Sequence, residues 1–103
     1  MKYLVSWTFR PGGSPAESEV AAKRALQVFG KWSPPADATF HAFLSRVDGA
    51  GGFALVESDN LRSVMEGPAK FGPWFDFQVV PVVDVAEGVQ IATEGIEFRD
   101  SIR

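Results

Sequence analysis

The sequence predicts an α+β domain in which strands and helices follow one another in the order β-α-β-β-α-β. Three observations carry this prediction. Large apolar residues alternate along Lys2–Phe9, Ser14-Pro15-Ala16-Glu17 has the composition of a helix start, and Phe75–Val83 is typical of a closing strand that is apolar on both faces. A chain of 103 residues is long enough for one modest core, so we expect a single domain over residues 1–103.

The first strand and the first helix have the clearest local patterns. One face of the strand carries four large residues, namely Tyr3, Val5, Trp7 and Phe9. Ser14 can cap the helix, Pro15 suits its first position, and Glu17 can reach back to the Ser14 backbone N–H. The helix is expected to end at Gly30. It should bury one apolar stripe, namely Ala21, Ala22, Ala25, Leu26 and Phe29.

The middle of the chain predicts a hairpin and a second helix. Thr39–Val47 and Gly52–Glu57 have strand patterns, and Asp48-Gly49-Ala50-Gly51 between them has the residues that a hairpin turn requires. We expect Asp59 to cap the second helix and Gly67-Pro68 to end it.

The closing strand, Phe75–Val83, is expected at an edge of the sheet. Pro81 lacks the N–H that a central strand would need, and an edge tolerates this loss. A C-terminal helical segment follows, because apolar residues recur there at helical spacing although two glycines weaken the pattern. The apolar residues are Val85, Val89, Ala92 and Ile96, and the glycines are Gly88 and Gly95.

This order of elements is a split β-α-β arrangement of the ferredoxin-like kind, with both helices on one face of a four-stranded antiparallel sheet. Neither face of the predicted sheet is polar, so a monomer would expose more apolar surface than soluble monomers usually tolerate. We therefore expect a homodimer in which two sheets stack face to face. The alternative is that the C-terminal segment folds back over the open sheet.

Composition argues against several classes of partner. The net charge is −3 and no cluster of Lys and Arg stands out, so nucleic acid is not an expected partner. The absence of cysteine excludes disulfides, thiolate nucleophiles and cysteine-ligated metals. No apolar run approaches the roughly 20 residues that span a bilayer, and no secretory leader precedes the first strand. We expect a cytoplasmic protein that does not bind membranes.

Four stretches of the chain carry a resemblance to a known family: Lys2–Phe9, Arg46–Glu57, Pro81–Asp84 and Phe98–Ser101. They resemble an uncharacterised bacterial family, domain of unknown function 3303, within the dimeric α/β-barrel superfamily. The resemblance implies the ferredoxin-like fold and the face-to-face dimer. It implies little about activity, because the family itself has no assigned function. The wider superfamily includes cofactor-independent monooxygenases, isomerases, haem enzymes and ligand-binding modules.

His41 is the first candidate for chemistry, because it is the single histidine of the chain. On the predicted strand it shares a face with Thr39, Phe43 and Ser45. It could act as a general base or as a hydrogen-bond partner of a ligand, and the structural interpretation is a half-exposed residue on an edge strand. One histidine without cysteine does not make a zinc site, so we expect no metal and no cofactor, with a single axial haem contact left open.

The other candidates are aromatic and polar residues that could line a pocket for a small apolar or aromatic molecule. They are Tyr3, Trp7, Phe43, Trp74, Asp76 and Gln78. The structural interpretation is plain core for the aromatic residues and a solvent-facing edge for the polar pair. The favoured function is a dimeric module that binds a small apolar or aromatic molecule, either in a pocket between the sheet and the helices or at the dimer interface. The alternative is a cofactor-independent monooxygenase or isomerase acting on a small aromatic or polyketide-like substrate, with His41 as base or hydrogen-bond donor.

Overall fold

The computed structural model describes residues 1–102, and Arg103, the last residue of the predicted domain, lies outside the described residues. The elements are β1 (Lys2–Phe9), α1 (Pro15–Lys31), β2 (Thr39–Ser45), β3 (Gly51–Glu57), α2 (Leu61–Phe71), β4 (Phe75–Val82) and α3 (Val85–Asp100). The α+β class and the C-terminal helix agree with the sequence-based prediction. No helix within residues 1–102 has the length and the apolar composition needed to cross a membrane.

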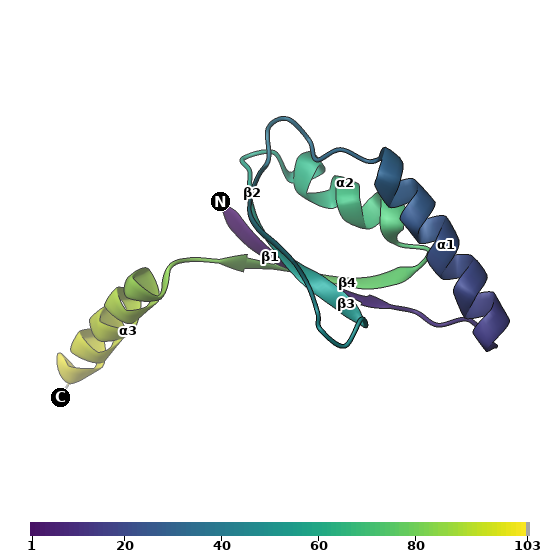
Figure 1. Ribbon diagram of the computed structural model, residues 1–103. Helices are drawn as coiled ribbons and strands as arrows, with labels where there is room; N and C mark the ends of the chain where they lie inside the picture. Colours follow the sequence, from purple (N-terminus) through teal and green to yellow (C-terminus); the bar gives the residue numbers. More distant parts are fainter. Residues whose placement is uncertain (103) are drawn as a thin grey trace.

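The strands form one open antiparallel sheet in the order β2-β3-β1-β4. β1 is central, so that Val5 lies opposite Ala54 of β3 on one side and Val79 of β4 on the other. β4 is an edge strand, as Pro81 predicts. Both α1 and α2 cover one face of the sheet, whereas α3 leads away from it beyond the end of β4 (Figure 1).

The core lies between the sheet and the two helices that cover it. Its buried residues are Tyr3, Val5, Ala54, Val56 and Val64, with Trp7, Phe40 and Phe77 packed against them. Alternate residues of the strands point to the opposite side of the sheet, which we call the open face. By strand register the open face carries Leu4, Ser6, Thr8, Leu44, Phe53, Leu55, Asp76, Gln78 and Val80.

A β-bulge in β2 changes which residues face the helices. Phe40 and Ala42 pair with consecutive residues of β3, so His41 is the additional residue. The bulge brings Phe43 to the helix side, where its ring lies 5.4 Å from that of Phe40 and 5.6 Å from that of Trp7. The prediction that His41 and Phe43 share a face is therefore wrong, because packing within this aromatic cluster overrides simple alternation.

The start of α1 follows its prediction in part. Ser14 is the N-cap, and its Oγ accepts a hydrogen bond from the Glu17 backbone N–H at 3.2 Å. The Glu17 carboxylate accepts from the Gly13 N–H at 2.9 Å rather than from that of Ser14. The cap still satisfies free N–H groups at the helix start, but one residue earlier than the sequence predicts.

The buried face of α1 is narrower than its apolar pattern predicts. Ala25 is buried, whereas Leu26 is 70% exposed and Phe29 is 49% exposed. The reason is that α1 approaches the sheet through small residues, which leaves the larger side chains at the flank of the helix. The flank formed by α1 and the neighbouring strand β2 therefore remains apolar.

The second helix, α2, begins and ends later than predicted. Asn60 rather than Asp59 is the N-cap, and its side-chain oxygen accepts from the Arg62 N–H at 3.1 Å. The helix continues through Pro68 to Phe71. A proline in the last turns costs one helical hydrogen bond, and the burial of the Phe71 ring offsets this cost.

Candidate functional site

The structure divides the predicted site residues among different surfaces. On the helix side of the sheet lie Tyr3, Trp7 and Phe43, while Asp76 and Gln78 lie on the open face. His41 lies at the bulge on the β2 edge, and Trp74 precedes β4 in the turn after α2. The seven residues therefore do not converge on one pocket.

The aromatic candidates on the helix side are packed on one another. The Trp7 ring lies edge-on to that of Phe43 at 5.6 Å and tilted to that of Phe77 at 6.5 Å. Tyr3 is buried, and its hydroxyl donates to the Met1 Sδ at 3.7 Å. These geometries are those of an aromatic core, in which the rings fill the space that a ligand would need.

His41 is paired with a carboxylate. Its Nε2 lies 2.7 Å from Glu57 Oε1, and both side chains are part-exposed. The hydrogen bond with His41 lowers the pKa of the Glu57 carboxyl below its ordinary value, and the positive charges of Lys2 and the N-terminus act in the same direction. A carboxylate that holds one ring nitrogen orients the imidazole, which is the arrangement of a positioned base.

Asp76 has a structural partner at the other end of the sheet. Arg10 Nε lies 3.2 Å from Asp76 Oδ1, and the same guanidinium donates to the carbonyl oxygens of Gly72 and Phe75. Arg10 follows β1, so these contacts tie the end of β1 to the start of β4. By register, this ion pair and the His41 pair occupy opposite edges and opposite ends of the sheet.

The open face between these two pairs is largely apolar. Leu4 is 40% exposed and Leu44 is 58% exposed. Phe53 and Val80 are also exposed there, while Ala42, Leu55 and Val82 are partly covered. Ser6 and Gln78 lie opposite each other in register on β1 and β4, and Thr8 and Asp76 do so nearer the end of the sheet where Arg10 lies. The open face thus has an apolar surface with Ser6 and Gln78 as the polar pair nearest its middle.

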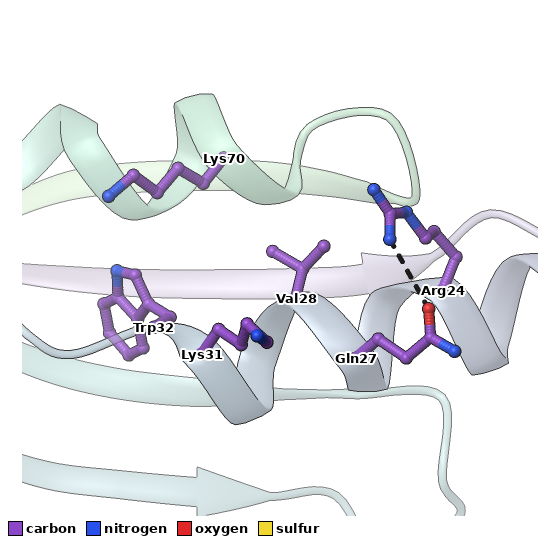
Figure 2. A pocket seen from close by; sticks show the side chains of 6 residues that line it. All are labelled: Arg24, Gln27, Val28, Lys31, Trp32 and Lys70. Carbon is purple, nitrogen blue, oxygen red and sulfur yellow. Dashed lines mark hydrogen bonds between the residues drawn. The ribbon is translucent and has the colours of Figure 1, made fainter.

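A hollow of about 430 Å³ lies between α1 and α2 (Figure 2). Its lining residues are Arg24, Gln27, Val28, Lys31, Trp32 and Lys70. The Trp32 indole Nε1 donates to Glu66 Oε2 at 3.0 Å, and Glu66 also pairs with Lys70. Sequence reasoning missed this basic hollow, although Arg24 and Lys31, two helical turns apart, were a signal for it.

Trp74 contributes to a second hollow, of about 480 Å³, against the other half of α1. Its other lining residues are Ala16, Glu17, Val20, Ala21 and Arg24. Trp74 therefore lies apart from the other aromatic candidates. Within residues 1–102 no group of three or more His, Asp or Glu side chains is placed to hold a metal ion.

Comparison with known proteins adds the family. No curated protein matches the chain. The model of a family described as "Domain of unknown function (DUF3303)" matches residues 1–96. This range includes the whole sheet, both covering helices and most of α3. The chain therefore belongs to the DUF3303 family.

Proposed function

We propose that the protein acts as a homodimer whose open faces stack on each other and enclose a small apolar or aromatic molecule. In this proposal each protomer is a ferredoxin-like unit and the pair forms a dimeric α/β barrel. The strand order β2-β3-β1-β4, with both covering helices on one face, supports the ferredoxin-like assignment. The observation that carries the proposal is the apolar open face.

An antiparallel sheet with one solvated face usually alternates between apolar residues inside and polar residues outside. Here the outward positions include Leu4, Leu44, Phe53 and Val80. A second copy of the same face would cover them, because stacking about a two-fold axis makes an apolar patch complementary to itself. Stacked sheets lie about 10 Å apart, which is the thickness of two interdigitated layers of side chains.

The ligand is inferred from the polar pair on the open face. Burying Ser6 and Gln78 between two sheets requires hydrogen-bond partners for both. A flat apolar molecule with one polar group would supply such a partner while its rings lie against Leu4 and Val80. Ser6 and Ala42 are small and leave space beside the larger residues.

The test is native mass spectrometry of the purified full chain together with two matched variants. We expect a dimer that carries added mass from a co-purified molecule. Val80→Lys, on the open face, should weaken the dimer by about 100-fold, since two charges would be desolvated at the centre of the interface. Val20→Lys makes the same change at an exposed position of α1 and should leave the dimer intact. A monomeric wild type, or a dimeric Val80→Lys variant, would contradict the proposal.

Ligand binding needs its own measurement. Gln78→Leu retains the size of the side chain and removes its hydrogen bonds. We expect this variant to remain dimeric but to lose the co-purified molecule and to bind the probe 1-anilinonaphthalene-8-sulfonate differently from the wild type. A wild-type dimer that carries no added mass and does not bind this probe would refute the ligand while leaving the dimer standing.

A second candidate function is favoured by the contact between His41 and Glu57. A histidine held at 2.7 Å by a carboxylate is suited to remove a proton from a bound substrate. We propose as the alternative a cofactor-independent monooxygenase or isomerase that acts on a small aromatic or polyketide-like substrate, with His41 as the base. In a screen of such substrates, His41→Ala should lower any turnover by about 100-fold or more without changing the dimer. Turnover that survives this change would remove His41 from the mechanism.

A further inference from the structure

We propose that α3 is a clasp that packs against the flank of the partner subunit, where α1 meets β2. This inference rests on the proposed dimer and adds where the C-terminal helix binds. It is carried by four observations: the mainly apolar half of α3, its direction, the area that a stable dimer needs, and a second uncovered apolar surface.

The surface of α3 is divided into a mainly apolar half and a polar half. At 100° per residue the mainly apolar half collects Val85, Val89, Ile91, Ala92, Ile96 and Phe98, with Gly88, Gly95 and Arg99 among them, and the polar half collects Glu87, Gln90, Thr93, Glu94, Glu97 and Asp100. None of the residues of α3 is buried in the protomer, and Val85 is 82% exposed. An isolated helix of 16 residues that contains two glycines is marginal in water. The helix therefore requires a surface on which to pack.

The direction of α3 places that surface outside its own protomer. Figure 1 shows α3 beyond the end of β4, on the side of the sheet opposite to α1 and α2. Only Val83 and Asp84 connect β4 to the helix, and the Asp84 carboxylate lies 3.6 Å from Lys2 Nζ. This ion pair holds the exit of the chain beside the start of β1. The protomer is 65 Å in its longest dimension, with α3 at one extreme.

The open face alone offers little area for a stable dimer. Seven or eight residues at about 3.3 Å along each strand and four strands about 4.8 Å apart give about 500 Å² per protomer, or about 1,000 Å² in all. Specific stable interfaces bury about 1,200–2,000 Å². One side of α3 covers about 240 Å² (about 24 Å by about 10 Å). A dimer has two such helices and two surfaces beneath them, which together add about 1,000 Å² to the area of the open faces and raise the total buried area to about 2,000 Å².

The flank of α1 and β2 is the second uncovered apolar surface. Leu26, Phe29 and Phe43 form it, and the rings of Phe29 and Phe43 lie 6.1 Å apart. Phe43 is 45% exposed although it contacts the aromatic core. β2 and β4 are opposite edges of the sheet, so a two-fold axis along the strands lays β4 of one protomer over β2 of its partner.

The length of α3 fits this flank. A helix about 24 Å long spans the gap of about 10 Å between stacked sheets and reaches the helix layer of the partner. On α1, Arg24 and Lys31 face the hollow toward α2, whereas Leu26 and Phe29 lie on the opposite side of the helix, so the contact with α3 would be apolar.

The first experiment measures the dimer dissociation constant of full-length variants by sedimentation. Ile91→Glu on α3 and Leu26→Glu on α1 should each raise it by about 100-fold, as expected for a charge placed in an apolar contact. Gln90→Glu and Gln27→Glu are the matched controls, because each adds the same charge at the residue next to Ile91 or Leu26, on the polar side of the helix. They should change the dimer dissociation constant by less than about 3-fold.

The second experiment identifies which subunit receives the clasp. Because the chain has no cysteine, Glu94→Cys gives a single site for a nitroxide label on the polar half of α3. Mixed dimers then combine one labelled protomer with one ¹⁵N-labelled protomer that has no nitroxide. We expect paramagnetic broadening of the amides of Leu26, Phe29 and Phe43 in the ¹⁵N-labelled partner.

The outcomes separate this inference from the proposed function. A wild-type monomer would overturn both. An intact dimer in which the mixed sample shows no broadening at the flank would overturn the clasp alone, whether α3 is free or packs elsewhere. Broadening that appears only when nitroxide and ¹⁵N are on the same chain would show that α3 folds back on its own protomer, which also overturns it.

Discussion

Gly52 is a position where a single added methyl group should damage the sheet. It lies on β3 between β1 and β2, opposite Trp7 on one side and Ser45 on the other. A Cβ at this position would meet the carbonyl oxygen of Leu44 and would lie 2.5 Å from Trp7 Cζ2. Carbon atoms in contact prefer about 3.5 Å, so the strands or the indole ring would have to move by about 1 Å. The absence of a side chain at Gly52 is therefore what lets Trp7 lie across β3.

Overpacking of this kind costs about 1–3 kcal/mol where side chains can adjust, and here one of the obstacles is backbone. We expect Gly52→Ala to lower the free energy of unfolding by about 3 kcal/mol, which lowers the melting temperature by about 12 °C for a domain of this size. Gly30→Ala is the matched control, because a Cβ at Gly30 meets nothing within 4 Å. In a helix this change should add about 0.5–1 kcal/mol. Both are measured by denaturant unfolding at one protein concentration. Stability of Gly52→Ala within about 0.5 kcal/mol of the wild type would refute the contact geometry.

Two further predictions concern polar contacts. His41→Ala should raise the pKa of Glu57 toward its ordinary value of 4.5, as followed by ¹³C NMR titration of the carboxyl, and an unchanged pKa would argue against the contact. Because the folded-state pKa of Glu57 is depressed, this contact contributes stability above the unfolded pKa and loses it as pH falls through the folded pKa. Asn60→Ala should cost about 1 kcal/mol in denaturant unfolding and raise the pKa of Asp37, since Asn60 caps α2 and donates to that carboxylate, whereas Asn60→Ser should retain the cap.

Features that depend on neighbouring residues could be predicted from the sequence. The capping serine of α1 at Ser14 and the hairpin turn around Gly49, where φ is 75°, are set by local hydrogen bonding and backbone sterics. Pro81 correctly indicated an edge strand, because a missing N–H has the same consequence in any sheet. The α+β class follows from these local features together.

Features that depend on packing could not be predicted. The bulge at His41 exists because Phe40 and Phe43 both reach the aromatic cluster, and alternation along β2 carries no sign of it. The same holds for α2, whose continuation through Pro68 depends on where Phe71 is buried. For the candidate site, the sequence supplied residue types, whereas the partners of His41 and Asp76 come from strands and loops distant in the chain.

The distribution of apolar residues ties the stability of the protomer to its assembly. Nearly half of the chain, 46%, is hydrophobic, yet within residues 1–102 no large side chain is less than 2% exposed. The three uncovered apolar surfaces are the open face, the flank of α1 and β2, and one half of α3. The open face and the flank would cost little to order in a dimer, because the strands and the helix that carry them already build the core, whereas α3 has no buried residue in the protomer and would gain its packing surface there. Covering them would complete the burial that a single small domain leaves unfinished. If the dimer forms as proposed, apolar surface that remains exposed in the folded protomer is buried only on association. Dimer formation therefore stabilises the folded state, and the free energy of unfolding depends on protomer concentration.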